Sequence, residues 1–309
     1  MAKGLSRGDK TWIITVSPDG HRHWLAGTPK QGLQGVELAR GLVGLDRAPT
    51  ELLWLQEAHQ NGADLVGNAV DVRTLKGAIN ILGSSPRDFR AKWDYWGRSW
   101  FFDRYTRMFF INSYNGYKYL DLLLGESPNG SIDMDPALLR REINYPYTWV
   151  APNPFYKGFP ESFEGEVPAS QAGHQVIDIK VRNLGTEKTF PKIYLPGPGI
   201  WSIPKGTRLP NRRGEEGRGE FDGEMIELPP LASGEGMWLN PDPRDETIEK
   251  VAADGEKTTN LWAYMNAQRP KIHLQGGSEE TWTFLVQGGV RSTSKKPKVV
   301  VQPLYSSFI

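Results

Sequence analysis

Short runs of alternating apolar and polar residues, separated by turn residues, make up most of this chain. Residues 11–16 and 21–26 lie on either side of a Pro-Asp-Gly turn, which predicts a hairpin. The segments 50–59 and 61–82 predict two or three further strands, and Asn61-Gly62, which opens the second segment, is a favoured hairpin turn. The chain therefore begins as antiparallel β-structure.

One helix is well marked between residues 85 and 100. Ser85 is a favoured N-cap, Pro86 suits the first helical position, and Asp88 lies in the first turn, where the helix dipole stabilises a carboxylate. An apolar stripe follows at helical spacing on one face: Phe89, Trp93, Trp96 and Trp100. We expect this stripe to be core, so that the helix covers one face of the N-terminal sheet.

Strand periodicity returns after the helix and ends at a group of prolines. Residues 100–126 alternate around an Asn115-Gly116 turn, and residues 143–149 alternate again after a short helical turn that begins at Pro136. Proline has no backbone N–H, so continuous pairing is impossible beyond this strand, at Pro152, Pro154 and Pro160. This pattern indicates two domains, residues 1–158 and 159–309.

The second domain has a strand pattern only. From residue 165 onward, eight or nine short apolar runs follow one another with turn residues between them and without helical period. That spacing predicts a β-sandwich or jelly roll. The 34 glycines and 23 prolines of the chain agree with many short strands joined by turns. The predicted fold is mainly β, an N-terminal β-domain with one packed helix followed by a β-sandwich.

The charge balance argues against nucleic acid and membranes as partners. The chain has 37 basic and 36 acidic residues and a net charge of +1, so no long-range field attracts phosphates or anionic lipid. No apolar run has the length of a signal sequence or a membrane span. We expect a soluble protein made in the cytoplasm, without sequence-specific nucleic-acid binding or membrane insertion.

No catalytic or cofactor signature is present. There are no cysteines, which excludes thiolate zinc sites and a cysteine nucleophile. His21 and His23 alternate on one strand face, but no third ligand lies at a matching offset. The acidic pairs stand in loops, and no phosphate-binding glycine motif follows a strand. We therefore expect no enzymatic activity, no metal and no cofactor.

Large apolar residues suggest two kinds of contact surface. Exposed indoles stack on sugar rings, so four of the 11 tryptophans are candidates for glycan contact, with core packing as the alternative: Trp201, Trp238, Trp262 and Trp282. The hairpin 11–26 and the loop 27–50 carry more apolar residues than one small sheet needs, which makes five of them candidates for a subunit interface: Trp12, Trp24, Leu33, Val36 and Leu38.

Three segments in the second half form an ordered set of motifs. Residues 181–199 read VRNLGTEKTFPKIYLPGPG, a strand that closes on Asp242 and Arg244 follows, and residues 269–277 read RPKIHLQGG. Upstream, APNPFYKG at 151–158 ends the first domain. In this order, the motifs resemble those of distal tail (minor tail) proteins of long-tailed bacteriophages, of the actinobacterial phage type. The residues that carry the first motif are Asn183, Gly185, Thr186, Thr189, Pro191 and Ile193.

The resemblance implies a structural protein of the virion. Members of this family form a ring, commonly hexameric, in which the N-terminal domain builds the ring and a galectin-like jelly roll projects outward. The implied partners are other copies of the chain, the major tail tube protein, and the tail-tip hub and tape-measure proteins. The implied roles are host attachment and DNA passage at the tail tip, after synthesis in the host cytoplasm. The alternative is a carbohydrate-binding module for a host cell-wall glycan.

Overall fold

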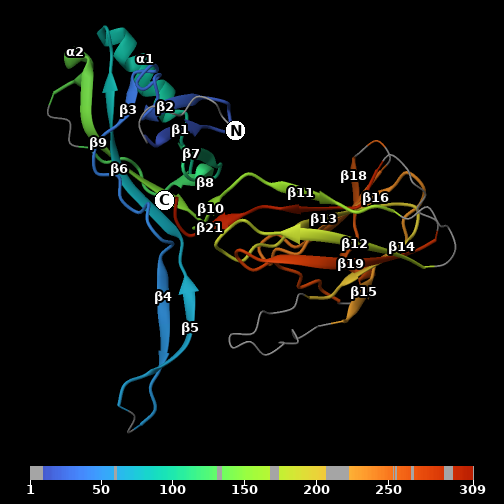
Figure 1. Cartoon of the computed structure of the whole chain (residues 1–309). Coiled ribbons are helices and arrows are strands. Elements are labelled where there is room, and N and C mark those ends of the chain that lie inside the picture. The colour runs from blue at the N-terminus through green and yellow to red at the C-terminus, as the bar shows by residue number, and fades with distance from the viewer. Residues whose placement is uncertain are drawn as a thin grey trace. The chain divides into compact units, whose positions relative to one another are not determined.

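The computed structural model of the chain describes residues 10–58, 61–130, 134–167, 174–206, 223–252, 254, 256–265, 268–288 and 295–308. The chain divides into two compact units, Met1–Gly158 together with Tyr305–Ile309, and Phe159–Leu304. Strands dominate both units (Figure 1), as the alternating pattern predicts. The mainly-β fold class is thereby confirmed.

A large antiparallel sheet forms the body of the first unit. Its strands lie in the order β2-β1-β7-β8-β9-β6-β3, and β10 pairs with β8 and with β21. The predicted hairpins around residues 17–21 and 113–115 are present as β1–β2 and β7–β8. The bounds are β1 Trp12–Val16, β2 Arg22–Ala26, β3 Val36–Leu38, β6 Arg73–Leu82, β7 Thr106–Asn112, β8 Gly116–Leu124, β9 Arg141–Ala151, β10 Tyr156–Lys157 and β21 Leu304–Tyr305.

Helix α1 (Pro86–Gly97) begins and packs as its sequence predicts. The Ser85 hydroxyl accepts a hydrogen bond from the Asp88 amide at 3.1 Å, which caps the first turn. Phe89 and Trp96 are buried, and the Trp96 ring meets the Tyr147 ring of β9 edge-on at 5.6 Å. Trp100 lies beyond the end of the helix and still enters the same core. The helix therefore covers the sheet with its aromatic face.

We expect Trp96→Ala to destabilise the first unit by roughly 3 to 5 kcal/mol, because it leaves a cavity among fully buried rings. The free energy of unfolding from urea denaturation measures this loss. Tyr114→Ala is the matched control, since Tyr114 is 87 % exposed. A Trp96→Ala protein that unfolds at the same urea concentration as the unmodified chain would contradict the packing described above.

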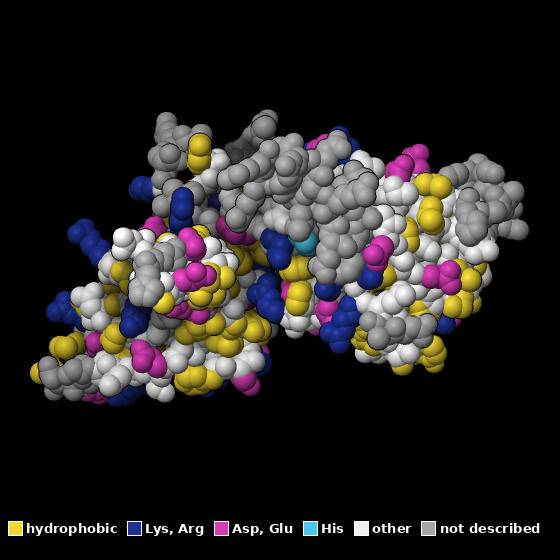
Figure 2. Space-filling model, turned by 90° about the horizontal axis from the view of Figure 1, so that it is seen from below, with side chains coloured by type: hydrophobic (Ala, Val, Ile, Leu, Met, Phe, Trp, Pro, Cys, Tyr) yellow, Lys and Arg dark blue, Asp and Glu magenta, His cyan; other side chains and the backbone are white. Residues whose placement is uncertain are grey.

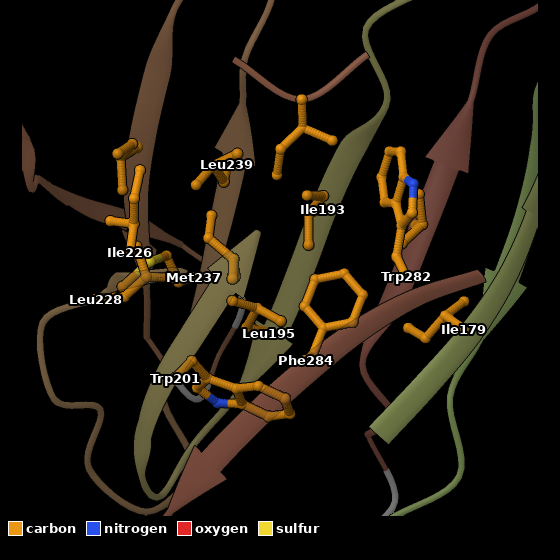
Figure 3. Close-up of a cluster of buried hydrophobic side chains, with 14 of the residues drawn as sticks. Ile179, Ile193, Leu195, Trp201, Ile226, Leu228, Met237, Leu239, Trp282 and Phe284 are labelled. Carbon is orange, nitrogen blue, oxygen red and sulfur yellow. The ribbon is translucent and has the colours of Figure 1, made fainter. Parts of the chain in front are cut away.

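The second unit is a β-sandwich of two sheets. One sheet has the order β11-β20-β13-β16-β17-β18 and the other has the order β12-β19-β14-β15. The bounds are β11 Glu161–Glu164, β12 His174–Arg182, β13 Lys192–Pro196, β14 Ile200–Pro204, β15 Met225–Glu227, β16 Gly236–Asn240, β17 Thr247–Val251, β18 Lys257–Asn260, β19 Glu279–Gln287 and β20 Lys298–Val301, with a 3-10 turn at Trp262–Tyr264. Side chains from both sheets fill the space between them (Figure 3).

The motif at 181–199 has a structural role inside this sandwich. Asn183 is buried, and its amide nitrogen donates to the Glu187 and Gln275 carbonyls at 2.8 and 3.0 Å. Its side-chain oxygen accepts from the Gly185 amide at 2.8 Å. A Cβ at Gly185 would lie 2.6 Å from the Leu304 nitrogen, so only glycine fits there. Asn183 and Gly185 thus hold the loop that joins β12 to β13.

The C-terminal boundary of the second unit differs from the one that the sequence predicts. Residues 305–309 were expected in the second domain, and they belong to the first unit. The Phe308 ring packs on the Phe110 ring at 5.4 Å, and the Ser307 carbonyl accepts from Lys118 at 3.1 Å. An alternating sequence pattern locates strands, but it does not show which of the two units a short C-terminal segment packs against. The second unit is therefore an insertion between two parts of the first.

Arg73 connects its own strand, β6, with three other segments of the first unit. Its guanidinium is fully buried and donates to the Pro154, Gly44, Asp46 and Ser306 carbonyls, each at 2.7 Å. It also lies 4.7 Å from the centre of the Tyr156 ring. Burial lowers the pKa of Arg73, and the nearby Tyr156 and Asp46 groups oppose this shift. One cation thereby orients the C-terminal segment and the loop at residues 44–46.

Residues 159–304 expressed alone are expected to fold as a β-rich monomer, because their hydrophobic core contains only residues of this unit. Circular dichroism and light scattering measure both properties. Residues 1–158 alone lack the Ser306 acceptor of Arg73 and are expected to be less stable than the intact first unit. An insoluble or helical 159–304 fragment would show that the division into units is mistaken.

Candidate functional site

The most unusual surface of the first unit is a free-standing hairpin, here called the arm (residues 50–58 and 61–72). Strands β4 (Thr50–Leu55) and β5 (Asp64–Val70) pair with each other in a two-stranded sheet. All of β4 is exposed, as is most of β5. Within the first unit, Figure 1 shows the arm extending away from α1 and from the large sheet. The arm thus receives little cover from its own unit.

Many exposed side chains of the arm are large and apolar. They include Trp54, which is 58 % exposed, and a further set of aliphatic residues: Leu52, Leu53, Leu55, Leu65, Val66, Val70 and Val72. Single exposed hydrophobic residues are common, but a contiguous group of this size marks a protein–protein contact. An isolated two-stranded hairpin is also marginally stable in water. Both facts make the arm a candidate contact surface.

Both faces of the arm are apolar. Residues opposite each other in the register share a face, and Trp54 lies opposite Leu65 after a bulge between Leu53 and Trp54. Leu52 shares that face, whereas Leu53 and Leu55 point to the other. A strand pair at the surface of its own fold normally has one polar face. The arm therefore has the pattern of an element buried on both sides.

The arm also carries acidic side chains but no Lys or Arg. Residues 48–72 contain four carboxylates and no Lys or Arg: Glu51, Glu57, Asp64 and Asp71. Figure 2 views the molecule from below and shows yellow hydrophobic and magenta acidic side chains close together on its left-hand part, which belongs to the first unit. Acidic groups around an apolar surface favour a partner with a basic rim.

A second apolar surface lies around helix α2 (Pro136–Leu139). It consists of five exposed side chains and is called the α2 patch: Leu82, Met134, Leu138, Leu139 and Ile143. Backbone pairing holds these segments together, since Leu82 lies opposite Arg141 and the Gly83 amide donates to the Arg140 carbonyl at 2.8 Å. Arg140 and Arg141 are exposed beside the leucines. This patch is apolar with a basic border.

The interface candidates from the sequence differ in exposure. Val36 is completely buried in the core of the first unit, so it is not a surface contact. Trp12 and Trp24 are partly buried, and Leu38 packs against the same core. Leu33 is 68 % exposed. The arm is not among the sequence-based candidates, because the four consecutive apolar residues 52–55 indicate a strand without showing that it is exposed.

The glycan candidates do not form a common platform. Trp201 and Trp282 are buried and point into the sandwich core (Figure 3), where the Trp201 nitrogen donates to the Pro196 carbonyl at 2.8 Å. They are core residues and not sugar-stacking surfaces, because the sandwich encloses both rings. Trp238 is partly buried and packs on Tyr194 at 5.2 Å. Trp262 is partly buried and donates to the Glu246 carbonyl at 3.2 Å.

The histidine pair of the first hairpin is enclosed by aromatic rings. His23 is fully buried, and its Nε2 lies 2.9 Å from the Ser99 hydroxyl, which donates to the Tyr95 carbonyl. Burial, with a smaller effect of His21, lowers the pKa of His23 to about 4. His23 is therefore neutral at physiological pH and shielded from solvent. Two further features of the sequence, His59 and the glycine-rich segment 214–222, lie outside the described residues.

The described part of the chain shows neither a metal-binding cluster nor a membrane-spanning helix. No group of three or more His, Asp or Glu side chains there is placed to hold a metal ion. No described helix has the length and apolar character required to cross a membrane.

The architecture defines the class of fold. It is similar to the crystal structure of SPP1 Dit (gp 19.1), described as a paradigm of the hub adsorption apparatus in phages that infect Gram-positive hosts, with a TM-score of 0.58 and 12 % identity over 94 % of this chain and 98 % of Dit. The chain has the Dit fold, which confirms the resemblance to distal tail proteins noted in the sequence. No family model matches the chain.

Sequence comparison adds two relatives. The chain is 25 % identical to minor tail protein Gp27 of Mycobacterium phage D29 and 23 % identical to minor tail protein Gp27 of Mycobacterium phage L5. Both alignments cover 81 % of this chain and 84 % of the relative. The chain is homologous to these mycobacteriophage minor tail proteins. Homology and fold together support a structural role at a phage tail tip.

Proposed function

We propose that this chain is a non-enzymatic structural protein of a phage virion that assembles into a ring at the tail tip. The observation that carries this proposal is the arm. Its large apolar side chains lie on both faces of the hairpin and are exposed to solvent in the single chain. Obligate subunit contacts are large and more hydrophobic than transient ones. The homology to minor tail proteins supports the place of the ring in the tail.

The ring is proposed to be a hexamer that joins the tail tube to the tip. Its neighbours would be the major tail tube protein, the tail-tip hub and the tape-measure protein. The first unit would build the ring around a lumen for DNA, and the second unit would contribute to host attachment. The near-neutral charge of the chain fits such a lumen, because a strongly basic wall would hold the phosphates.

Light scattering and negative-stain images of the purified full-length chain test this proposal. We expect a mass six times that of one chain and particles with a central hole. A protein that stays monomeric at high concentration, alone and with its tail tube protein, would contradict the proposal. Binding of that monomer to a glycan column would instead favour the carbohydrate-binding alternative.

A further inference from the structure

We propose that the arm of one subunit docks on the α2 patch of the next copy of the chain, with the acidic groups of the arm against Arg140 and Arg141. This inference rests on the proposed ring and names the two surfaces that close it. The occupant of the α2 patch is thus a second copy of this chain, and the contact is head-to-tail.

The positions of the two surfaces favour a head-to-tail contact. The arm continues through Asp71 and Val72 into the first residue of β6, Arg73, whereas Leu82 of the α2 patch is the last residue of that strand. Ten residues of extended chain separate them by about 30 Å. Two different surfaces at opposite ends of one strand suit a heterologous contact, which closes into a ring when the rotation between subunits is right.

The apolar content of the two surfaces is matched. Each presents several exposed leucines. A contact between them buries apolar area on both partners at the same time. One chain carries both halves, so no additional protein is needed to cover either.

The charges of the two surfaces are complementary. The arm has four carboxylates and no basic residue, and Arg140 and Arg141 border the α2 patch. An acidic group beside the patch is already compensated, since Asp135 is paired with Arg90 at 3.0 Å. The patch therefore offers its arginines to an acidic partner, whereas two arms would repel each other.

Cysteine cross-linking tests this contact directly, because the chain contains no cysteine. A full-length Leu53→Cys protein is mixed with a full-length Leu138→Cys protein, and a short bismaleimide is added to the assembled mixture. We expect a covalent dimer on a denaturing gel, formed by one chain of each variant. A chain with both substitutions should give a ladder that ends at the number of subunits in the ring. Leu53→Cys mixed with Tyr114→Cys is the control, since Tyr114 is 87 % exposed and lies outside the α2 patch.

The outcomes separate this inference from the proposed ring. Rings that form without the Leu53–Leu138 cross-link, or that cross-link equally to position 114 or between two arms, overturn the arm contact and leave the ring intact. A chain that forms no rings and no cross-links overturns both proposals. Charge reversal by Arg140→Glu with Arg141→Glu gives a second readout. It should weaken self-association on the order of 10- to 100-fold, and Glu51→Lys with Asp64→Lys should restore it.

Discussion

Arg73→Ala is expected to unfold the first unit. The substitution removes a fully buried guanidinium and leaves four carbonyls without their donor. An unsatisfied buried polar group costs about 1 to 3 kcal/mol, so the sum approaches the roughly 5 to 15 kcal/mol that stabilise a whole domain. Urea denaturation followed by tryptophan fluorescence measures the loss, since many tryptophans lie in this unit.

Two variants make this result specific. Arg73→Lys keeps the charge but cannot reach four carbonyls with one ammonium group, so its stability should lie between those of the alanine variant and the unmodified chain. Arg182→Ala, which removes an exposed ion pair with Glu161 at 3.1 Å, should cost about 1 kcal/mol or less. If Arg73→Ala and Arg182→Ala unfold at the same urea concentration, the connection through Arg73 contributes little.

Trp54→Thr combined with Leu65→Thr is expected to dissociate the ring into folded monomers. The two side chains lie opposite each other on one face of the arm and are exposed in the single chain, so their loss does not disturb a core. Threonine keeps a high strand propensity, which preserves the hairpin. Interface anchors typically contribute about 2 kcal/mol or more each, so the pair should weaken association by roughly 1,000-fold.

Sedimentation at several protein concentrations gives the association constant, and circular dichroism checks that the fold is retained. Tyr114→Thr serves as the control, since it removes one large exposed aromatic side chain outside the arm. Rings that survive the double substitution at low concentration would mean that the arm does not carry the subunit contact. In that case Leu33, the exposed member of the sequence-based interface candidates, becomes the next residue to change.

Local signals explain which elements could be predicted. Ser85, Pro86 and Asp88 act within one helical turn, so α1 could be located from sequence and the structure confirms it. The hairpin β7–β8 turns before Gly116, where a positive φ of 69° requires the freedom of glycine. The Asn61-Gly62 turn likewise predicted the pairing of β4 with β5. Interactions between near neighbours in sequence were sufficient for each of these.

The candidate site could not be predicted because exposure is a property of the assembled fold. The run 52–55 has the pattern of a strand buried on both faces, and it is exposed in the single chain. A sequence pattern does not distinguish a strand buried by its own domain from one buried by another subunit. The same limit applies to Trp201 and Trp282, since alternation shows which residues share a face but not which face turns inward.

The sequence by itself determined the mainly-β architecture, helix α1 and the resemblance to phage tail proteins, because periodicity, caps and turn residues act over a few positions. Only the tertiary structure decided that Arg73 joins four segments, that residues 305–309 return to the first unit, and that the arm stands free. These features depend on contacts between residues far apart in the chain. Ser306 is 233 positions from Arg73, and no local pattern specifies a hydrogen bond over that separation.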